Sequence, residues 1–197
     1  MPRRLPAPTR EQAVARFEEL YDASYRDVLA YLLRRVQQPD QAADLVADVF
    51  TAVWRRIDDV PPGDQARPWV FGVARHVLAN HRRGARRVNA LSARLRSELR
   101  ETTVTHPGDG GLGEIGAVFR SLSDQDQEIL ALAGWEEFDA GQIAVVLGCA
   151  RGTARVRLHR ARNRFARALR RAGLEIDGHL SPSTVTRRPT TAKGATS

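Results

Sequence analysis

Residues 138–169 read FDAGQIAVVLGCARGTARVRLHRARNRFARAL, and this stretch decides the fold of the C-terminal part of the chain. A helix-turn-helix needs a short first helix with a small residue facing the second helix, and a glycine at the tight turn between them. Ala144 is such a small residue, and Gly148 stands where the turn is needed. The pattern predicts one helix over residues 139–147 and a second over residues 151–171.

The second of these helices has an apolar side and a basic side. Small and apolar residues recur at steps of three and four and form the predicted inward stripe: Ala154, Leu158, Ala161, Phe165 and Leu169. The side chains left outside are almost all basic: Arg151, Arg155, Arg157, His159, Arg160, Arg162 and Arg164. Residues 151–171 hold nine arginines and no acid, and such a cluster repels itself unless an anion binds it. We therefore expect a recognition helix for DNA, with a merely basic surface helix as the alternative.

Charge is distributed unevenly along the chain. The net charge is +8, and Lys193 is the only lysine, so almost all of the positive charge comes from arginine. Residues 11–64 nevertheless carry eleven acids against six arginines, whereas residues 75–100 carry eight arginines against Glu98 alone. An acidic front followed by two basic blocks indicates two kinds of partner, one of them a nucleic acid.

Three amphipathic helices are predicted upstream of the helix-turn-helix. Apolar residues at helical spacing place them at about residues 10–36, 41–57 and 68–87. Asp40 is the expected N-cap of the second helix. The Pro-Pro-Gly sequence within residues 58–67 predicts a loop before the third helix.

The predicted fold class is all-α, with two small helical domains joined by a flexible linker and a helix-turn-helix in the C-terminal domain. Ser123 is expected to start a short helix, with Asp126 three residues on in a capping-box-like arrangement. The chain shows no β-strand pattern. The expected divisions are a disordered leader, a first helical domain, a flexible linker, a second helical domain and a disordered tail, at residues 1–10, 11–87, 88–118, 119–173 and 174–197.

Several classes of protein are excluded by composition. No apolar run approaches the ~20 residues that span a bilayer, and the basic start MPRRLPAPTR lacks the apolar stretch of a signal peptide. Cys149 is the only cysteine, so no disulfide framework or cysteine-cluster zinc site is possible. The five histidines are scattered, and helix capping explains Asp124, Asp126 and Glu128 better than a catalytic cluster does. We expect a cytoplasmic protein that is not an enzyme, with no metal, no cofactor and no membrane insertion.

Three further segments extend the pattern toward the N-terminus. They read DQAADLVADVFTAVW at residues 40–54, ARPWVFGVARHVLANHRRGARR at residues 66–87 and LSDQDQEIL at residues 122–130. Together with the helix-turn-helix, and in this order, they resemble the sigma-70-type RNA polymerase sigma factors of the extracytoplasmic-function (ECF) group. The resemblance covers nearly all of the chain from Phe17 to Leu169. It implies an alternative sigma factor that binds core RNA polymerase and directs promoter recognition, DNA melting and transcription initiation.

The resemblance also implies which residues meet which partner. The first helical domain matches sigma region 2 and the second matches sigma region 4. The residues implied in binding core polymerase lie in the second predicted helix: Asp44, Asp48, Phe50 and Trp54. Those implied in binding the −10 element lie in the third, after the loop: Trp69, Arg75, His76, Arg82, Arg83, Arg86 and Arg87. Those implied in binding the −35 element lie in the recognition helix: Arg151, Thr153, Arg155, Val156, His159 and Arg160. An anti-sigma factor is a further implied partner.

Three positions depart from the family pattern. The family usually has glutamine, asparagine and serine where this chain has Ala47, His76 and Val156. Ala47 bears on the contact with core polymerase, His76 on the reading of the −10 element and Val156 on the reading of the −35 element.

Two other functions remain open at this point. A helix-turn-helix repressor or activator, acting without core polymerase, would bind duplex sites on its own, and those sites are usually palindromic because of dimer symmetry. A nuclease is the third class, but the sequence shows no metal-binding carboxylate cluster.

Overall fold

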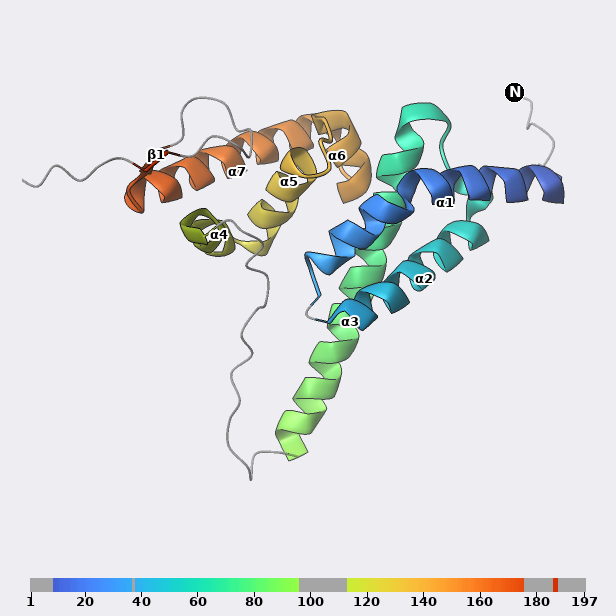
Figure 1. Cartoon of the computed structure of the whole chain (residues 1–197), viewed down its shortest axis with the longest axis horizontal. Helices are drawn as coiled ribbons and strands as arrows, with labels where there is room; N and C mark the ends of the chain where they lie inside the picture. The colour runs from blue at the N-terminus through green and yellow to red at the C-terminus, as the bar shows by residue number, and fades with distance from the viewer. Residues whose placement is uncertain (1–8, 37, 96–112, 176–185, 188–197) are drawn as a thin grey trace, which may run out of the picture. The chain divides into compact units, whose positions relative to one another are not determined.

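The structure is a computed structural model, and it describes residues 9–36, 38–95, 113–175 and 186–187 (Figure 1). The predicted all-α class is confirmed. The elements are α1 (Arg10–Leu33), α2 (Pro39–Arg55), η1 (Ile57–Asp59), η2 (Gly63–Gln65), α3 (Ala66–Leu95), α4 (Gly113–Arg120), α5 (Asp124–Gly134), α6 (Ala140–Leu147), α7 (Arg151–Arg171), β1 (Leu174–Glu175) and β2 (Thr186–Arg187). The strands were not predicted; they form an antiparallel pair of two residues each.

The chain divides into two units, and the first contains α1, α2 and α3. Each of these helices packs against the other two. Their apolar stripes meet in a core whose largest members are fully or almost fully buried: Val28, Tyr31, Leu32, Val49, Val53, Val70, Phe71 and Leu78. The Tyr31 and Phe71 rings meet edge to face with centroids 5.4 Å apart. Arg67 of α3 also donates from Nε and Nη2 to Oδ2 of Asp27 on α1, at 3.1 and 2.8 Å.

The start of α1 agrees with the sequence-based prediction, whereas that of α2 differs from it. α1 begins at Arg10, where Thr9 and Gln12 form a complete capping box. The prediction of Asp40 as an N-cap was wrong: α2 begins at Pro39, its N-cap is Gln38, and Asp40 lies in its first turn. Proline favours this early start because its fixed φ angle suits the first helical position and its missing N–H costs no hydrogen bond there.

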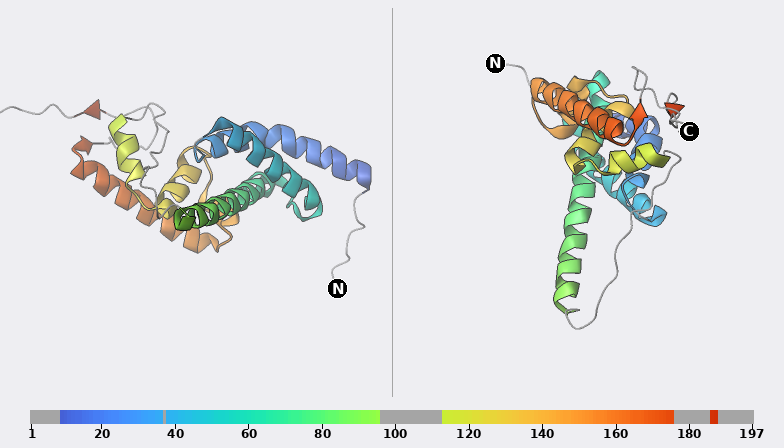
Figure 2. Two further views of the ribbon diagram at one scale, coloured as in Figure 1. Left: turned by 90° about the horizontal axis from the view of Figure 1, so that it is seen from below. Right: turned by 90° about the vertical axis from the view of Figure 1, so that its left-hand side faces the viewer.

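The third helix is longer than the sequence pattern predicts. α3 begins at Ala66, before Pro68, and continues to Leu95, eight residues past the predicted end at Arg87. Figure 1 shows its last turns (green) extending beyond α1 and α2, and both views in Figure 2 show one unbroken helix. Part of the predicted linker is therefore helical, in α3 and again in α4. Its middle, at residues 96–112, lies outside the described residues, as do residues 1–8 and most of the predicted tail.

The second unit contains α4, α5, most of α6, and α7. α7 packs against α5 and α4. The predicted inward stripe of α7 is confirmed at Ala154, Leu158, Ala161 and Leu169, which are buried, while Phe165 is half-buried. The predicted cap of α5 is also confirmed, because the Ser123 side chain accepts from the backbone N–H of Asp126.

The tight turn between α6 and α7 is where the sequence placed it. Gly148 has a φ of 62°, a left-handed conformation that glycine adopts at little cost. Asp139 caps the start of α6, where its Oδ1 accepts from the N–H groups of Gly141 and Gln142 at 2.6 and 2.8 Å. These N–H groups hold the pKa of Asp139 below its usual value, with the bond from Gln142 contributing most. Local sequence therefore defines both ends of α6: Asp139 caps its start, and Gly148 forms the turn that follows it.

We expect Gly148→Ala to destabilise the turn between α6 and α7, and with it the fold, by about 1–2 kcal/mol, the cost of a side chain in the left-handed region. No atom lies within 4 Å of the position that a Cβ at Gly148 would take, so the cost comes from the backbone alone. Gly152→Ala is the matched control: its Cβ position is equally open and it lies within α7, so it should be neutral or stabilising by up to about 1 kcal/mol. Thermal unfolding measures both. Equal effects of the two substitutions would contradict the assignment.

Candidate nucleic-acid interface

The outer face of α7 presents all six residues that were predicted to read the −35 element. Each is exposed: Arg151, Thr153, Arg155, Val156, His159 and Arg160. They lie within the first three turns of the helix, over roughly 14 Å of its length at about 1.5 Å per residue. Val156, one of the departures from the family pattern, is 45% exposed, so its side chain is on the surface that DNA would meet.

Asn163 joins this face, although the sequence reasoning did not single it out. Its amide Nδ2 lies 3.0 Å from Nε2 of His159, one helical turn earlier. Arg167 Nε in turn donates to the Asn163 backbone carbonyl at 3.3 Å. The four-residue spacing of His159 and Asn163 was the sequence signal for this contact, because side chains four residues apart are neighbours on a helix surface. The contact places the Asn163 amide beside the His159 ring on this face.

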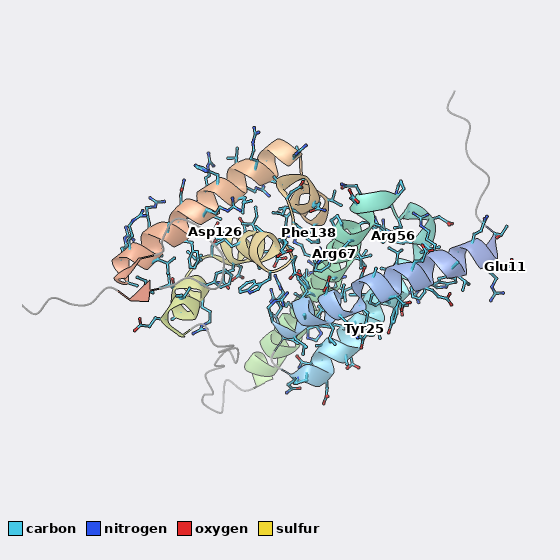
Figure 3. The ribbon with its side chains drawn as sticks, turned by 45° about the horizontal axis from the view of Figure 1, so that its top comes forward. Glu11, Tyr25, Arg56, Arg67, Asp126 and Phe138 are labelled. Carbon is cyan, nitrogen blue, oxygen red and sulfur yellow. The ribbon has the colours of Figure 1, made fainter. Side chains whose placement is uncertain are left out.

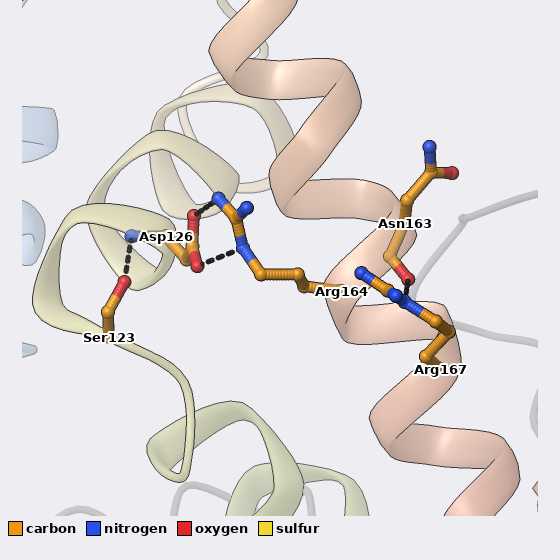
Figure 4. Close-up of polar contacts among 5 residues, drawn as sticks. All are labelled: Ser123, Asp126, Asn163, Arg164 and Arg167. Carbon is orange, nitrogen blue, oxygen red and sulfur yellow. Dashed lines mark hydrogen bonds and ion pairs between the residues drawn. The ribbon is translucent and has the colours of Figure 1, made fainter.

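One arginine of α7 is turned away from the predicted basic face. Arg164 forms a two-bond ion pair with Asp126 of α5: Nε donates to Oδ2 at 2.6 Å and Nη2 donates to Oδ1 at 2.5 Å (Figure 4). Asp126 is only 6% exposed. Asp126 was predicted to take part in capping and Arg164 to lie on the outward face; the Arg164 side chain is still 45% exposed, and the two side chains in addition link α5 to α7.

The ion pair shifts the protonation equilibria of both groups. The hydrogen bonds from Arg164 lower the pKa of Asp126, and burial of the carboxyl opposes this effect only in part. The same bonds raise the pKa of Arg164. A buried carboxylate needs such a partner, because desolvation without pairing is costly. The pair thus holds the recognition helix to the helix beneath it.

Asp126→Asn is expected to lower the melting temperature of the second unit by roughly 5–10 °C at neutral pH, through loss of the charge-assisted pair. The lowered pKa of the folded state fixes the sign of the pH dependence. The stabilisation is complete above the ordinary value of 3.8 and is lost as pH falls through the lower, folded value. The gap between wild type and variant should therefore be constant from neutral pH to about pH 5 and close below about pH 4. Hydrogen exchange of α5 and α7 localises the effect, and a gap that widens on acidification would refute it.

In the first unit, the residues predicted to bind polymerase divide into exposed and buried ones. Asp44 and Asp48 are exposed on α2, four residues apart and so on one side of the helix. Trp54 is 40% exposed, but Phe50 is only 4% exposed. Ala47, the departure in this helix, is exposed beside them. Phe50 therefore supports this surface from beneath.

The buried ring of Phe50 is the centre of an aromatic cluster that the sequence analysis did not assign to the site. Phe17, Tyr21 and Tyr25 of α1 lie around it, with ring centroids 6.3, 4.7 and 6.3 Å from its own. Phe17 also meets Trp54 edge to face at 5.4 Å. The four-residue spacing of the α1 aromatics was the signal, since it puts all three on one face. The cluster joins α1 and α2 and leaves Tyr21 and Trp54 partly exposed.

The residues predicted to read the −10 element lie along α3 at different depths. Trp69 and Arg75 are half-buried, whereas His76, Arg82 and Arg83 are exposed. His76 is held by a contact of 2.8 Å between its Nδ1 and the Gly72 carbonyl. The side chains of the remaining two, Arg86 and Arg87, lie outside the described residues.

Arg56, which the sequence analysis did not single out, lies over the Trp69 ring. Its guanidinium carbon is 5.2 Å from the ring centroid, and its Nε donates to Oδ2 of Asp59 at 3.0 Å. Arg56 lies at the start of the loop between α2 and α3, and Arg67 lies in α3 just after that loop; both are labelled in Figure 3. A cation beside an indole face is a stable arrangement.

Among the residues that the structure describes, no group of three or more histidine, cysteine or acidic side chains could hold a metal ion. In the same residues, no helix combines the length and the apolar character that crossing a bilayer requires.

Comparison with known families agrees with the two-unit division. The Sigma-70 region 2 family matches residues 20–88, and the Sigma-70, region 4 family matches residues 112–165. The ECF RNA polymerase sigma factor SigL of Mycobacterium tuberculosis is 31% identical over 156 residues, which are 77% of this chain and 85% of that protein. The RNA polymerase sigma factor YlaC of Bacillus subtilis is 27% identical over 150 residues, 74% of this chain and 87% of that protein.

Solved structures show the same fold. The sigma factor RpoE of Bartonella quintana, in complex with the anti-sigma factor NepR, matches with a TM-score of 0.56 and 26% identity, over 78% of this chain and 96% of that chain. CnrH, in complex with the cytosolic domain of CnrY, matches with a TM-score of 0.54 and 20% identity, over 81% and 95%. Both sigma regions, the relatives and the fold lead to one conclusion: this chain belongs to the ECF group of the sigma-70 family and is an alternative sigma factor that directs promoter-specific transcription initiation with RNA polymerase.

Proposed function

We propose that this sigma factor uses three separate surfaces: α7 for the −35 element, α3 with the loop before it for the −10 element, and α2 for core polymerase. The exposed, acid-free outer face of α7 carries the proposal furthest, because the eight arginines of this helix other than Arg164 place like charge close together, and an anionic partner offsets that repulsion. The corresponding sigma regions span residues 11–87 and 119–173. No catalytic step belongs to this chain; polymerisation belongs to the core enzyme.

Recognition of the −35 element rests on the geometry of α7. The outer face of its first three turns is exposed, and these turns follow directly on the Gly148 turn, as insertion into a major groove requires. Arg155 and Arg160 are the candidates for base contacts, because arginine pairs bidentately with guanine O6 and N7. The remaining arginines contact phosphates and set the register. The Asp126–Arg164 pair keeps the helix in place while its outer face binds.

The −10 element is bound through Trp69 and its surroundings. Extruding a base costs a few kcal/mol, which stacking on a protein ring can offset. The half-buried Trp69 ring offers such a stacking surface when the exposed Arg56 side chain, which lies over it, moves to the phosphate of the extruded nucleotide. The arginines that follow along α3 contact the backbone of the melted strand. Arg82 and Arg83 are exposed for this role.

Core polymerase binds to α2 through Asp44, Asp48 and Trp54, with Phe50 holding the surface from beneath. Exposed carboxylates beside a partly exposed indole are suited to a basic and apolar protein surface and would repel DNA. An anti-sigma factor is proposed as a competitor for the polymerase-binding residues, by analogy with the B. quintana relative, whose structure includes one. The chain acts in the cytoplasm, where transcription takes place.

The test is transcription in vitro with sigma-free core polymerase, the purified chain and a library of upstream fragments from its own genome. Chain-dependent transcripts with mapped start sites would support the proposal and reveal both promoter elements together. Absence of transcripts, combined with tight binding of duplex DNA by the chain alone, would contradict it and favour a repressor. Transcripts that share a −10 but no −35 element would remove the role proposed for α7.

A further inference from the structure

Val156 is an apolar side chain in the middle of the basic outer face of α7. It is 45% exposed, and no other large apolar side chain among the described residues is as exposed. The residues one turn before and after it on the same face are Thr153, His159 and Arg160, which are all exposed and polar. An apolar group is therefore presented to solvent from within a polar, positively charged surface.

Helix geometry points Val156 directly away from the core of its unit. It lies two residues after Ala154 and two before Leu158, both of which are buried. Two residues correspond to a rotation of about 200°, so Val156 is opposite both. The residue one turn earlier is Gly152, where a Cβ would meet no atom within 4 Å. Because helical side chains lean toward the N-terminus of their helix, Val156 and Gly152 form a small, unobstructed apolar patch.

We propose that this apolar patch packs against the C5 methyl group of a thymine in the −35 element, which makes Val156 a specificity-determining residue. The contact presupposes the −35 role proposed for α7 and so rests on that proposed function. In the major groove the thymine methyl is an apolar group, whereas guanine, cytosine and adenine present hydrogen-bond donors and acceptors. Valine has no side-chain donor or acceptor, so packing it against those edges would leave a polar group without a partner. The patch therefore favours a T·A pair at one position.

An exposed valine without a role is the competing explanation, because single apolar side chains are common on protein surfaces. Two observations favour the DNA contact. Valine is a poorer helix former than alanine and arginine, which make up most of α7, so helix stability does not account for it. Val156 also lies at the centre of the face whose positive charge suits DNA, and not at its edge.

The experiment removes the methyl group from the DNA and the apolar group from the protein in turn. Each thymine of the −35 element, in a promoter found by the transcription screen, is replaced singly by deoxyuridine, which pairs with adenine but lacks the C5 methyl. Holoenzymes contain wild-type chain, Val156→Ser, Val156→Ile or the control Val14→Ser, and their promoter affinities are measured by titration. For wild type we expect one replacement to raise the dissociation constant about threefold to fivefold, as loss of one buried methyl group implies.

The variants assign that effect to a residue. In Val156→Ser the same replacement should leave the dissociation constant unchanged, whereas Val156→Ile, which stays apolar and β-branched, should keep the thymine preference. Serine and valine have similar helix propensities, so α7 should be retained, and circular dichroism checks this. Val14→Ser makes the same change at another exposed valine, in α1, and should behave as wild type.

Each possible failure has its own result. If no −35 thymine is sensitive to replacement in wild type, or the element contains no T·A pair, the methyl contact is overturned. A thymine effect that persists in Val156→Ser would assign the methyl to another residue. Loss of affinity for core polymerase in Val156→Ser, with the thymine effect unchanged, would assign the patch to the polymerase. All of these results leave the proposed function intact, whereas failure of the wild-type holoenzyme to bind any promoter would overturn it.

Discussion

Replacing Asp48 with arginine is expected to abolish binding of the chain to core RNA polymerase without unfolding it. Asp48 is exposed on α2, and no hydrogen bond or ion pair within the described residues is recorded for it, so the fold should not depend on its charge. A cation in place of a carboxylate that meets a basic surface on the partner costs several kcal/mol of binding free energy. We expect the dissociation constant to rise about a hundredfold or more.

The measurement is a titration of labelled core polymerase with the variant chain, and circular dichroism confirms that the helices are retained. Glu11→Arg serves as the matched control, because Glu11 is also exposed but lies in the first turn of α1, outside the proposed surface. Glu11→Arg should bind core with an affinity close to that of wild type. Equal loss in both variants would show that net charge, and not the α2 surface, governs binding; normal binding by Asp48→Arg would remove α2 from the interface.

Arg155→Ala and Arg160→Ala are expected to relax the preference for the −35 sequence while the promoter is still bound. Both side chains are exposed on α7 and neither has a recorded partner within the described residues, so their removal should leave the packing of the second unit unchanged. Each lost bidentate base contact costs about 1–3 kcal/mol of discrimination, roughly a 5- to 150-fold change in relative affinity. The effect should fall on particular base pairs and not on all sequences alike.

Selection of binding sites from a randomised −35 region, with holoenzyme containing each variant, measures this directly. Arg171→Ala is the control: it removes the same charge from the last residue of α7, beyond the outward positions of the first three turns. That control should weaken binding uniformly and keep the sequence preference. If both test variants select the same −35 sequence as wild type, Arg155 and Arg160 contact phosphates, and the residues that contact the bases lie elsewhere on α7.

Much of the fold could be predicted from local sequence. The apolar stripe of α7 and the glycine of the turn are visible in the residues themselves, and the structure confirms both. The capping of α5 by Ser123 is equally local, because the donor and acceptor are three residues apart. Helix ends were less predictable. Pro39 starts α2 earlier than predicted, and α3 continues into a stretch whose apolar pattern had weakened.

Part of the candidate site could be predicted in the same way. Exposure of the −35 residues follows from the stripe, since a residue that does not face the core of a small helical unit faces solvent. Exposure of Asp44 and Asp48 follows from the alternation of apolar and acidic positions on α2. Phe50 belongs to the same helix, but a phenylalanine in such a pattern can either be presented to a partner or fill the core. The position of the α1 aromatics decides between these, and it buries the ring.

The sequence by itself determined the helical class, the helix-turn-helix and the segregation of acidic from basic segments, because each depends on residues within about two helical turns of one another. Only the tertiary structure decided which charged groups are partners. Asp126 and Arg164 are 38 positions apart, and Asp27 and Arg67 are 40 apart. Periodicity specifies the side of a helix on which a residue lies, but not the residue that faces it from another helix. Packing of the helices brings those groups together, and the direction of a flexible arginine is then set by whichever acceptor or ring lies within its reach.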